Sequence, residues 1–160
     1  LMPLEKYMIV EIYHDDGGRE TAGYKGSAGD CVTRAIAIAA KLPYREVYNA
    51  LAEGNATQRS SKRERKTKNR TPVRTARNGI YVKRKWFKDY MKGLGFKWTS
   101  TMQIGSGCQV HLRPDELPKT GRHVLSLSKH YAAYVDGTLR DTYDCSRDGT
   151  RCVYGYWSLT

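Results

Sequence analysis

The chain has 160 residues, of which 39% are hydrophobic and 28% are charged. This length suits one domain and is too short for two well-buried ones, so we expect a single domain over residues 1–160. No apolar run reaches the roughly 18 residues that a membrane-spanning helix needs, so no membrane partner is predicted. The segment Leu1–Tyr13 carries Glu5, Lys6 and Glu11 and does not resemble a secretion signal, which favours a cytoplasmic location.

The formal net charge of +12 is concentrated in one segment. Between Arg59 and Lys88 the sequence has 13 Lys and Arg residues and one acid, Glu64. The remainder is balanced, which indicates a neutral domain with a basic insert at about 55–79. The insert is either a solvated loop or an arm that binds nucleic acid or an acidic partner. The candidate binding residues are Arg59, Lys62, Arg63, Arg65, Lys66, Lys68, Arg70, Arg74, Arg77, Lys83, Arg84 and Lys85.

Four cysteines without a secretion signal predict a reducing compartment and free thiols. Cys145 and Cys152 could close a small loop if they were oxidised. No C-x-x-C pair occurs, so no metal site and no cofactor are predicted.

Strand and helix signals come in chain order. Leu4–Tyr13 is typical of a strand and is followed by a turn cluster. A helix is predicted after Asp30, which suits an N-cap, because apolar residues recur at helical spacing from Val32 to Ala39. A second helix is predicted after Pro43, with Gly54 just past its end, and a third from about Ile80 to Lys92.

The rest of the chain predicts strands. The candidates are Cys108–Leu112, Val124–Leu127, His130–Val135, Thr138–Tyr143 and Cys152–Trp157. Asp136-Gly137, between the third and the fourth candidate, is a strong hairpin signal. Helices followed by a mostly antiparallel sheet indicate the α+β class.

Cys31 is the candidate nucleophile because it opens the first predicted helix. The positive end of a helix dipole favours a thiolate, and the thiolate is the reactive form of cysteine. The backbone N–H of a residue in the first helical turn has no partner within the helix and can stabilise an oxyanion.

His130 is the candidate base, and the hairpin register selects its acidic partner. If Asp136-Gly137 is a two-residue turn, Val135 pairs with Thr138. The alternation of side chains then places Asp141 on the face of His130, diagonal to it. Asp144 lies on the opposite face in this register and is the reserve candidate, since a slip of one residue would exchange the two.

Three segments together resemble a papain-like cysteine peptidase: GDCVTRAIA at 29–37, KHYAAYVDG at 129–137, and Arg140-Asp141. The order of nucleophile, histidine and acid is that of the family, and the Cys31 segment is also similar to that of ovarian-tumour-type deubiquitinases. The whole chain resembles small uncharacterised proteins of bacteriophages and prophages. This resemblance implies a bacterial host cytoplasm and a papain-like fold, with N-terminal helices packed on a C-terminal antiparallel sheet.

The resemblance also implies a function. Cys31, His130 and Asp141 would cleave a peptide or isopeptide bond through an acyl-thioester intermediate. The family pattern has a Gln before the nucleophile, where this chain has Lys25, so the oxyanion candidates are the Cys31 backbone, Ser27 and Gln103. The alternative is a non-catalytic phage protein, of an inhibitor or anti-defence type, that binds nucleic acid or an acidic host partner through the basic insert.

Overall fold

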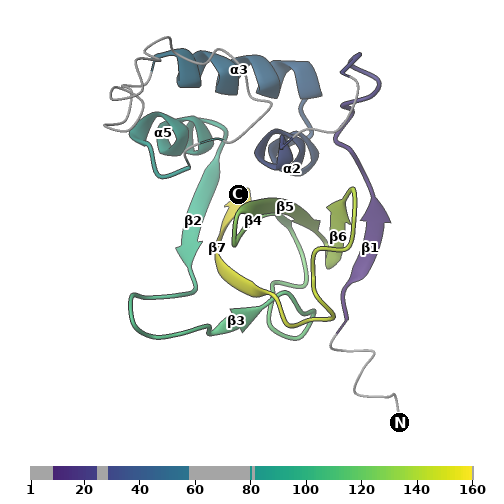
Figure 1. The fold of residues 1–160 in the computed structure, drawn as a ribbon, viewed down its shortest axis with the longest axis vertical. Coiled ribbons are helices and arrows are strands. Elements are labelled where there is room, and N and C mark those ends of the chain that lie inside the picture. Colours follow the sequence, from purple (N-terminus) through teal and green to yellow (C-terminus); the bar gives the residue numbers. More distant parts are fainter. Residues whose placement is uncertain (1–8, 25–28, 58–79, 81, 160) are drawn as a thin grey trace, which may run out of the picture.

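The computed structural model describes residues 9–24, 29–57, 80 and 82–159, and it has an α+β fold. Within these residues the helices gather on one side of a curved sheet (Figure 1). The helices are α2 (Cys31–Ala40), α3 (Tyr44–Thr57) and α5 (Lys85–Gly93). The strands are β1 (Glu11–His14), β2 (Phe96–Ser100), β3 (Val110–His111), β4 (Arg122–Leu127), β5 (His130–Val135), β6 (Thr138–Asp141) and β7 (Cys152–Leu159).

The sheet is mixed: it is mostly antiparallel, as expected, with one parallel pair that was not expected. Its strand order is β1-β6-β5-β4-β7-β2, with β3 paired to β7. β1 runs parallel to β6 at one edge, and the remaining described pairs are antiparallel. A parallel pair needs a long crossover between its strands, and here the connection includes all three described helices.

Helix α2 lies at the centre of the fold, and apart from Thr33 and Arg34 its residues are apolar. Every residue from Val32 to Ala39 is buried, and Lys41 ends the helix with a left-handed φ of 55°. One core cluster fills the space between the helices and the sheet and includes Ile36 and Ala133. A second cluster includes Tyr134 and Leu139. β5 contributes to both clusters, so it is buried along its whole length.

The helix boundaries differ from the predicted ones at two places. Helix α3 continues through Gly54 to Thr57, and the indole of Trp86 lies where a Cβ at Gly54 would be. The first residues of the predicted basic insert, 55–57, therefore belong to α3, and 58–79 lie outside the described residues. Helix α5 begins at Lys85 rather than near Ile80.

The predicted hairpin is confirmed, and one strand was not predicted. Asp136 and Gly137 have φ angles of 48° and 83°, and Val135 pairs with Thr138 as expected. β2 was not predicted because only its first residue, Phe96, is buried, which leaves little hydrophobic alternation. β3 is much shorter than the predicted Cys108–Leu112.

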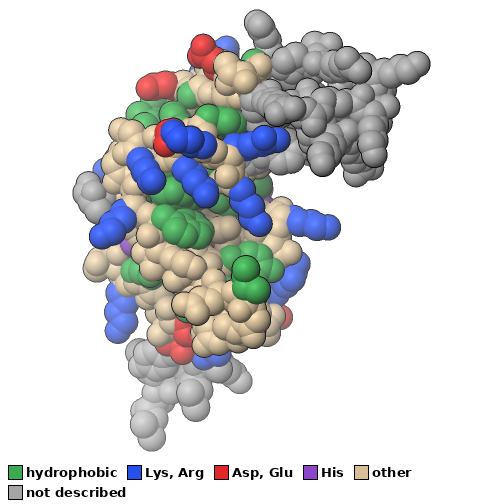
Figure 2. Space-filling view, turned by 90° about the vertical axis from the view of Figure 1, so that its left-hand side faces the viewer, with side chains coloured by type: hydrophobic (Ala, Val, Ile, Leu, Met, Phe, Trp, Pro, Cys, Tyr) green, Lys and Arg blue, Asp and Glu red, His purple; other side chains and the backbone are tan. Residues whose placement is uncertain are grey.

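One face of the molecule, formed by α5 and β2, combines apolar and basic side chains. Figure 2 shows Lys and Arg side chains bordering exposed apolar ones on this side. Trp98 on β2 and Tyr154 on β7 are among the exposed large hydrophobic residues. None of the described helices has the length and apolar character that crossing a bilayer requires.

Candidate active site

Cys31 is the first residue of α2 and is half-buried. Its Sγ accepts a hydrogen bond of 3.4 Å from the backbone N–H of Tyr131, on β5. Packing of α2 against β5 therefore brings together two segments that are distant in the sequence. The sulfur lies at the positive end of the helix dipole and beside a backbone donor, and both favour a thiolate.

His130 opens β5 and is hydrogen-bonded to Asp141, the last residue of β6. The His130 Nε2 and the Asp141 Oδ2 are 2.6 Å apart, and the two residues are only 8% and 4% exposed. The tight turn at Asp136-Gly137 sets this register. Because Nε2 is bonded to the carboxylate, Nδ1 is the ring nitrogen that remains for another partner.

The pKa values of Cys31 and His130 shift in opposite directions. Burial raises the pKa of Cys31, but the hydrogen bond and charge of His130, the Tyr131 amide and the charge of Arg34 outweigh it and lower that pKa. Burial lowers the pKa of His130, but hydrogen bonds with Asp141, Cys145 and Cys31 raise it to about 11. Both shifts are in the direction that favours a thiolate–imidazolium pair over two neutral groups.

Asp141 also faces a second cation. Arg34, one turn into α2, places its guanidinium 3.7 Å from the Asp141 carboxylate and forms an ion pair with Asp30. Burial raises the pKa of Asp141, and the hydrogen bond and charge of His130, the Thr142 amide and Arg34 lower it below its usual value. Asp141 is therefore ionised and can orient the imidazolium.

Asp30 occupies the N-cap position of α2, as predicted, but it does not cap the helix. Its side chain makes no hydrogen bond to the helix amides. It binds instead the guanidinium of Arg34, the hydroxyl of Tyr44 and, at 3.1 Å, the guanidinium of Arg19. Asp30 thus holds the Arg34 guanidinium in position, and Arg34 in turn contacts Asp141.

Cys145 is a buried thiol beside the imidazole. Burial raises its pKa, so it stays protonated at neutral pH. His130, Asp141 and Cys145 each offer a potential metal ligand within 4.8 Å of the others. These are ligand types that zinc accepts, although the carboxylate and the imidazole are also bonded to each other.

The structure places the remaining predicted site residues differently. Asp144, the reserve acid, accepts hydrogen bonds from the amide and hydroxyl of Ser146 and so stabilises its own turn. Gln103 lies in the loop after β2, where its backbone contacts Ser106. Ser27 is outside the described residues. The backbone N–H of Cys31, at the helix start, remains the oxyanion candidate next to the sulfur.

The predicted basic binding residues fall into two groups. Lys83, Arg84 and Lys85 lie just before and at the start of α5, where Lys85 pairs with Asp89 at 2.6 Å. The other nine lie outside the described residues: Arg59, Lys62, Arg63, Arg65, Lys66, Lys68, Arg70, Arg74 and Arg77. Their binding role stays a prediction.

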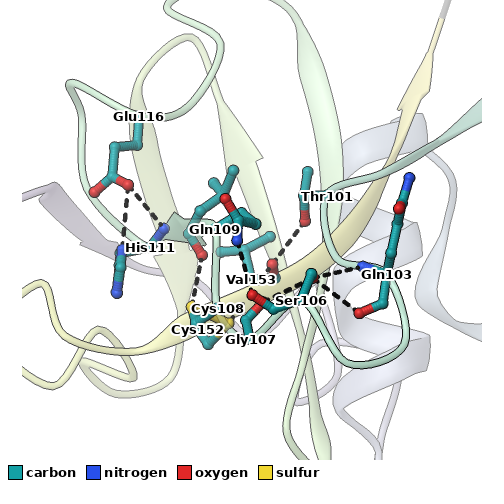
Figure 3. The surroundings of a disulfide bond; sticks show 11 residues. Thr101, Gln103, Ser106, Gly107, Cys108, Gln109, His111, Glu116, Cys152 and Val153 are labelled. Atoms are coloured by element: carbon teal, nitrogen blue, oxygen red, sulfur yellow. Dashed lines mark hydrogen bonds and ion pairs between the residues drawn. A yellow bond between two sulfur atoms is a disulfide. The ribbon is translucent and has the colours of Figure 1, made fainter.

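A disulfide between Cys108 and Cys152 corrects the expectation of four free thiols (Figure 3). It also excludes a Cys145–Cys152 bond in this structure. The sequence spacing could not indicate the pair, because pairing of β3 with β7 is what brings the two cysteines together, with Cα atoms 5.9 Å apart. Cys31 and Cys145 remain as the free thiols.

The chain was compared with known protein families, curated proteins and solved structures. No match was found.

Two residues of the site were not predicted from the sequence. Arg34 is a charged side chain in an otherwise apolar helix, and this exception was a signal that it has a buried partner. Cys145 follows β6 in an irregular segment, and no pattern in the sequence indicates its contact with His130.

Proposed function

We propose that the chain is a papain-like thiol hydrolase that cleaves a peptide or isopeptide bond. The main support is the buried 2.6 Å contact between His130 and Asp141, beside a cysteine at a helix N-terminus. Further support comes from the lowered pKa of Cys31 and the raised pKa of His130. Nucleophile, base and orienting acid are the three roles that thiol catalysis needs.

In the acylation half-reaction, the Cys31 thiolate attacks the substrate carbonyl carbon. A C–S bond forms, and the carbonyl π electrons move to the oxygen, where the Cys31 backbone N–H is placed to donate. The oxyanion then collapses, the C–N bond breaks, and the leaving amine takes a proton from the His130 imidazolium. Asp141 holds the ring in place throughout.

In the deacylation half-reaction, water replaces the amine. Neutral His130 removes a proton from the water as the oxygen attacks the thioester carbon. Collapse of the second oxyanion breaks the C–S bond, which releases the acid and restores the thiolate–imidazolium pair.

Alkylation by iodoacetamide near pH 6 tests the proposal. The Cys145→Ser chain is used, so that Cys31 is the remaining free thiol, and modification is followed by mass spectrometry. We expect Cys31 to react much faster than a free cysteine thiol, because more of it is thiolate at this pH. The thiolate fraction of a mostly protonated thiol changes about tenfold for each pKa unit.

The matched control is the same chain with His130→Ala. Loss of the imidazolium removes a contact that lowers the Cys31 pKa, so rapid alkylation should move to higher pH. Equal rates near pH 6 in both chains would contradict the proposed ion pair and, with it, the thiol mechanism.

A further inference from the structure

A pocket of about 680 Å³ lies beside α5 and β2. Its volume is within the range of small-molecule and side-chain binding sites. β4, β5 and β7 contribute lining residues from the sheet, and the loop after β2 contributes others. We call it the α5–β2 pocket; its lining residues are Val82, Lys83, Lys88, Lys92, Trp98, Met102, Gln103, Ile104, Ser126, Tyr131, Tyr154 and Trp157.

Exposed apolar side chains gather at this pocket. Trp98 is 40% exposed and Tyr154 is 38% exposed, and Ile104 in the loop is fully exposed. Figure 2 shows this face, with apolar side chains surrounded by basic ones. Large apolar side chains left in water at one place are typical of a binding surface.

The aromatic wall of the pocket is held in place by its neighbours. The Trp98 ring occupies the position where a Cβ at Gly155 would be, with Trp98 atoms within 2.5 Å of that position. Its ring centroid is also 5.2 Å from that of Trp157. A side chain fixed in this way loses little conformational entropy when a ligand binds.

The charged residues that line the pocket are all basic. Lys83, Lys88 and Lys92 line it, and none of its described lining residues is acidic. A ligand with carboxylates around an apolar group would complement both the apolar surface and the lysines.

Tyr131 connects the pocket to the candidate nucleophile. Its side chain lines the pocket, and its backbone N–H donates to the Cys31 sulfur. One residue therefore contacts both the pocket and the thiol. A thiolate attacks acyl carbons, which a peptide offers and a nucleic-acid backbone does not.

We propose that the α5–β2 pocket binds an acidic peptide segment with a large apolar side chain and that this segment is the substrate class of the Cys31 site. The proposal rests on the thiol hydrolase function. The apolar side chain enters between Trp98 and Ile104, and flanking carboxylates pair with Lys88 and Lys92.

Fluorescence anisotropy tests the binding with a fluorescein-labelled Glu-Glu-Phe-Glu-Glu peptide and the Cys31→Ala chain, which cannot react. We expect saturable binding that weakens when Lys replaces Glu or when Gly replaces Phe in the peptide. The Lys88→Glu/Lys92→Glu chain should bind about tenfold more weakly or worse, as loss of about 1.4 kcal/mol would produce. Ile104→Ser should also weaken binding and, being fully exposed, should not affect folding.

Lys97→Glu is the matched charge control. Lys97 is exposed on β2 but its side chain points to the face opposite Trp98, so this change should leave peptide affinity within about twofold. An equal loss in both charge variants would overturn the pocket assignment. If oligo-dT displaces the peptide with equal or higher affinity, the proposed peptide ligand is wrong and single-stranded nucleic acid is favoured as the ligand of the pocket.

Separate measurement of Cys31 alkylation distinguishes the two proposals. If the peptide does not bind but Cys31 remains reactive near pH 6, the substrate class is wrong and the thiol function stands. If the peptide binds and Cys31 is unreactive, the ligand class is supported and the thiol function is wrong.

Discussion

At the scale of single residues, Asp141 has two roles, because it faces two cations. It is almost fully buried and faces both His130 and Arg34. A buried carboxylate without cations would be protonated, and two buried cations without the carboxylate would repel each other. The same carboxylate that orients the imidazole therefore also stabilises the fold.

Asp141→Asn should destabilise the protein by about 3–5 kcal/mol, because it leaves a buried charge without its partner. Asp144→Asn is the control and should cost about 1 kcal/mol, since it weakens a local turn. Urea unfolding measures both changes. The Asp141 variant alone should also raise the pH at which Cys31 becomes reactive, and an equal shift in the Asp144 variant would favour the reserve acid.

The pH dependence of stability follows from the same contacts. The lowered pKa of Asp141 contributes stability above the unfolded value of 3.8, and this contribution is lost as the pH falls through the lowered value. The raised pKa of His130 contributes fully below 6.5, and its contribution is lost as the pH rises toward about 11. The contact between His130 and Asp141 should therefore be most stabilising between about pH 3.8 and pH 6.5.

At the scale of elements, the contact between α3 and the start of α5 depends on a glycine. A Cβ at Gly54 would come within 2.2 Å of the Trp86 ring. Glycine lowers helix stability, which is why Gly54 was predicted to end α3. Here the close approach of an indole is the reason that glycine is needed inside the helix.

Gly54→Ala should therefore lower the thermal unfolding midpoint. Its clash with Trp86 should cost about 1–3 kcal/mol, which exceeds the gain in helix propensity of about 1 kcal/mol. Gly93→Ala, near the end of α5, has open space around the new methyl group and should be neutral or slightly stabilising. A stabilising effect of Gly54→Ala would show that Trp86 does not pack closely against residue 54.

At the scale of the whole molecule, the disulfide ties the loop after β2 to β7. The Cys108–Cys152 bond closes a chain segment that includes β4, β5 and β6. It therefore restricts the unfolded chain and holds the loop that contributes Ile104 to the pocket.

Cys108→Ser/Cys152→Ser should lower the free energy of unfolding by about 2–4 kcal/mol relative to the oxidised chain. Adding a reductant should reduce the stability of the original chain and leave that of the variant unchanged. A reductant effect of the same size in both chains would exclude the disulfide as its source.

The basic residues between Arg59 and Arg77 predict a nucleic-acid-binding activity that can be removed without destabilising the domain. Replacing the nine bases between Arg59 and Arg77 with Gln should leave thermal stability unchanged, because this is the segment predicted to be an insert in a neutral domain. In filter-binding measurements at low salt, the variant should bind single-stranded DNA much more weakly than the original chain does, since phosphate contacts depend on local positive charge. Unchanged DNA binding would remove the basic insert from the nucleic-acid hypothesis.

Much of the local structure was predictable from residue patterns. The start of α2 at Cys31 follows from helical spacing after Asp30, and the pairing of Val135 with Thr138 follows from the turn preference of Asp-Gly. These features depend on residues close together in the chain. For the same reason, the side of the hairpin on which Asp141 lies was predictable.

Long-range contacts were decided only by the tertiary structure. Four features join elements that are far apart in the sequence. They are the parallel pairing of β1, the Cys108–Cys152 bond, the link that Arg34 makes between Asp30 and Asp141, and the α5–β2 pocket. Hydrophobic periodicity shows which face of an element is buried but not which neighbour covers it. That choice depends on how the surfaces of all the elements pack together at once.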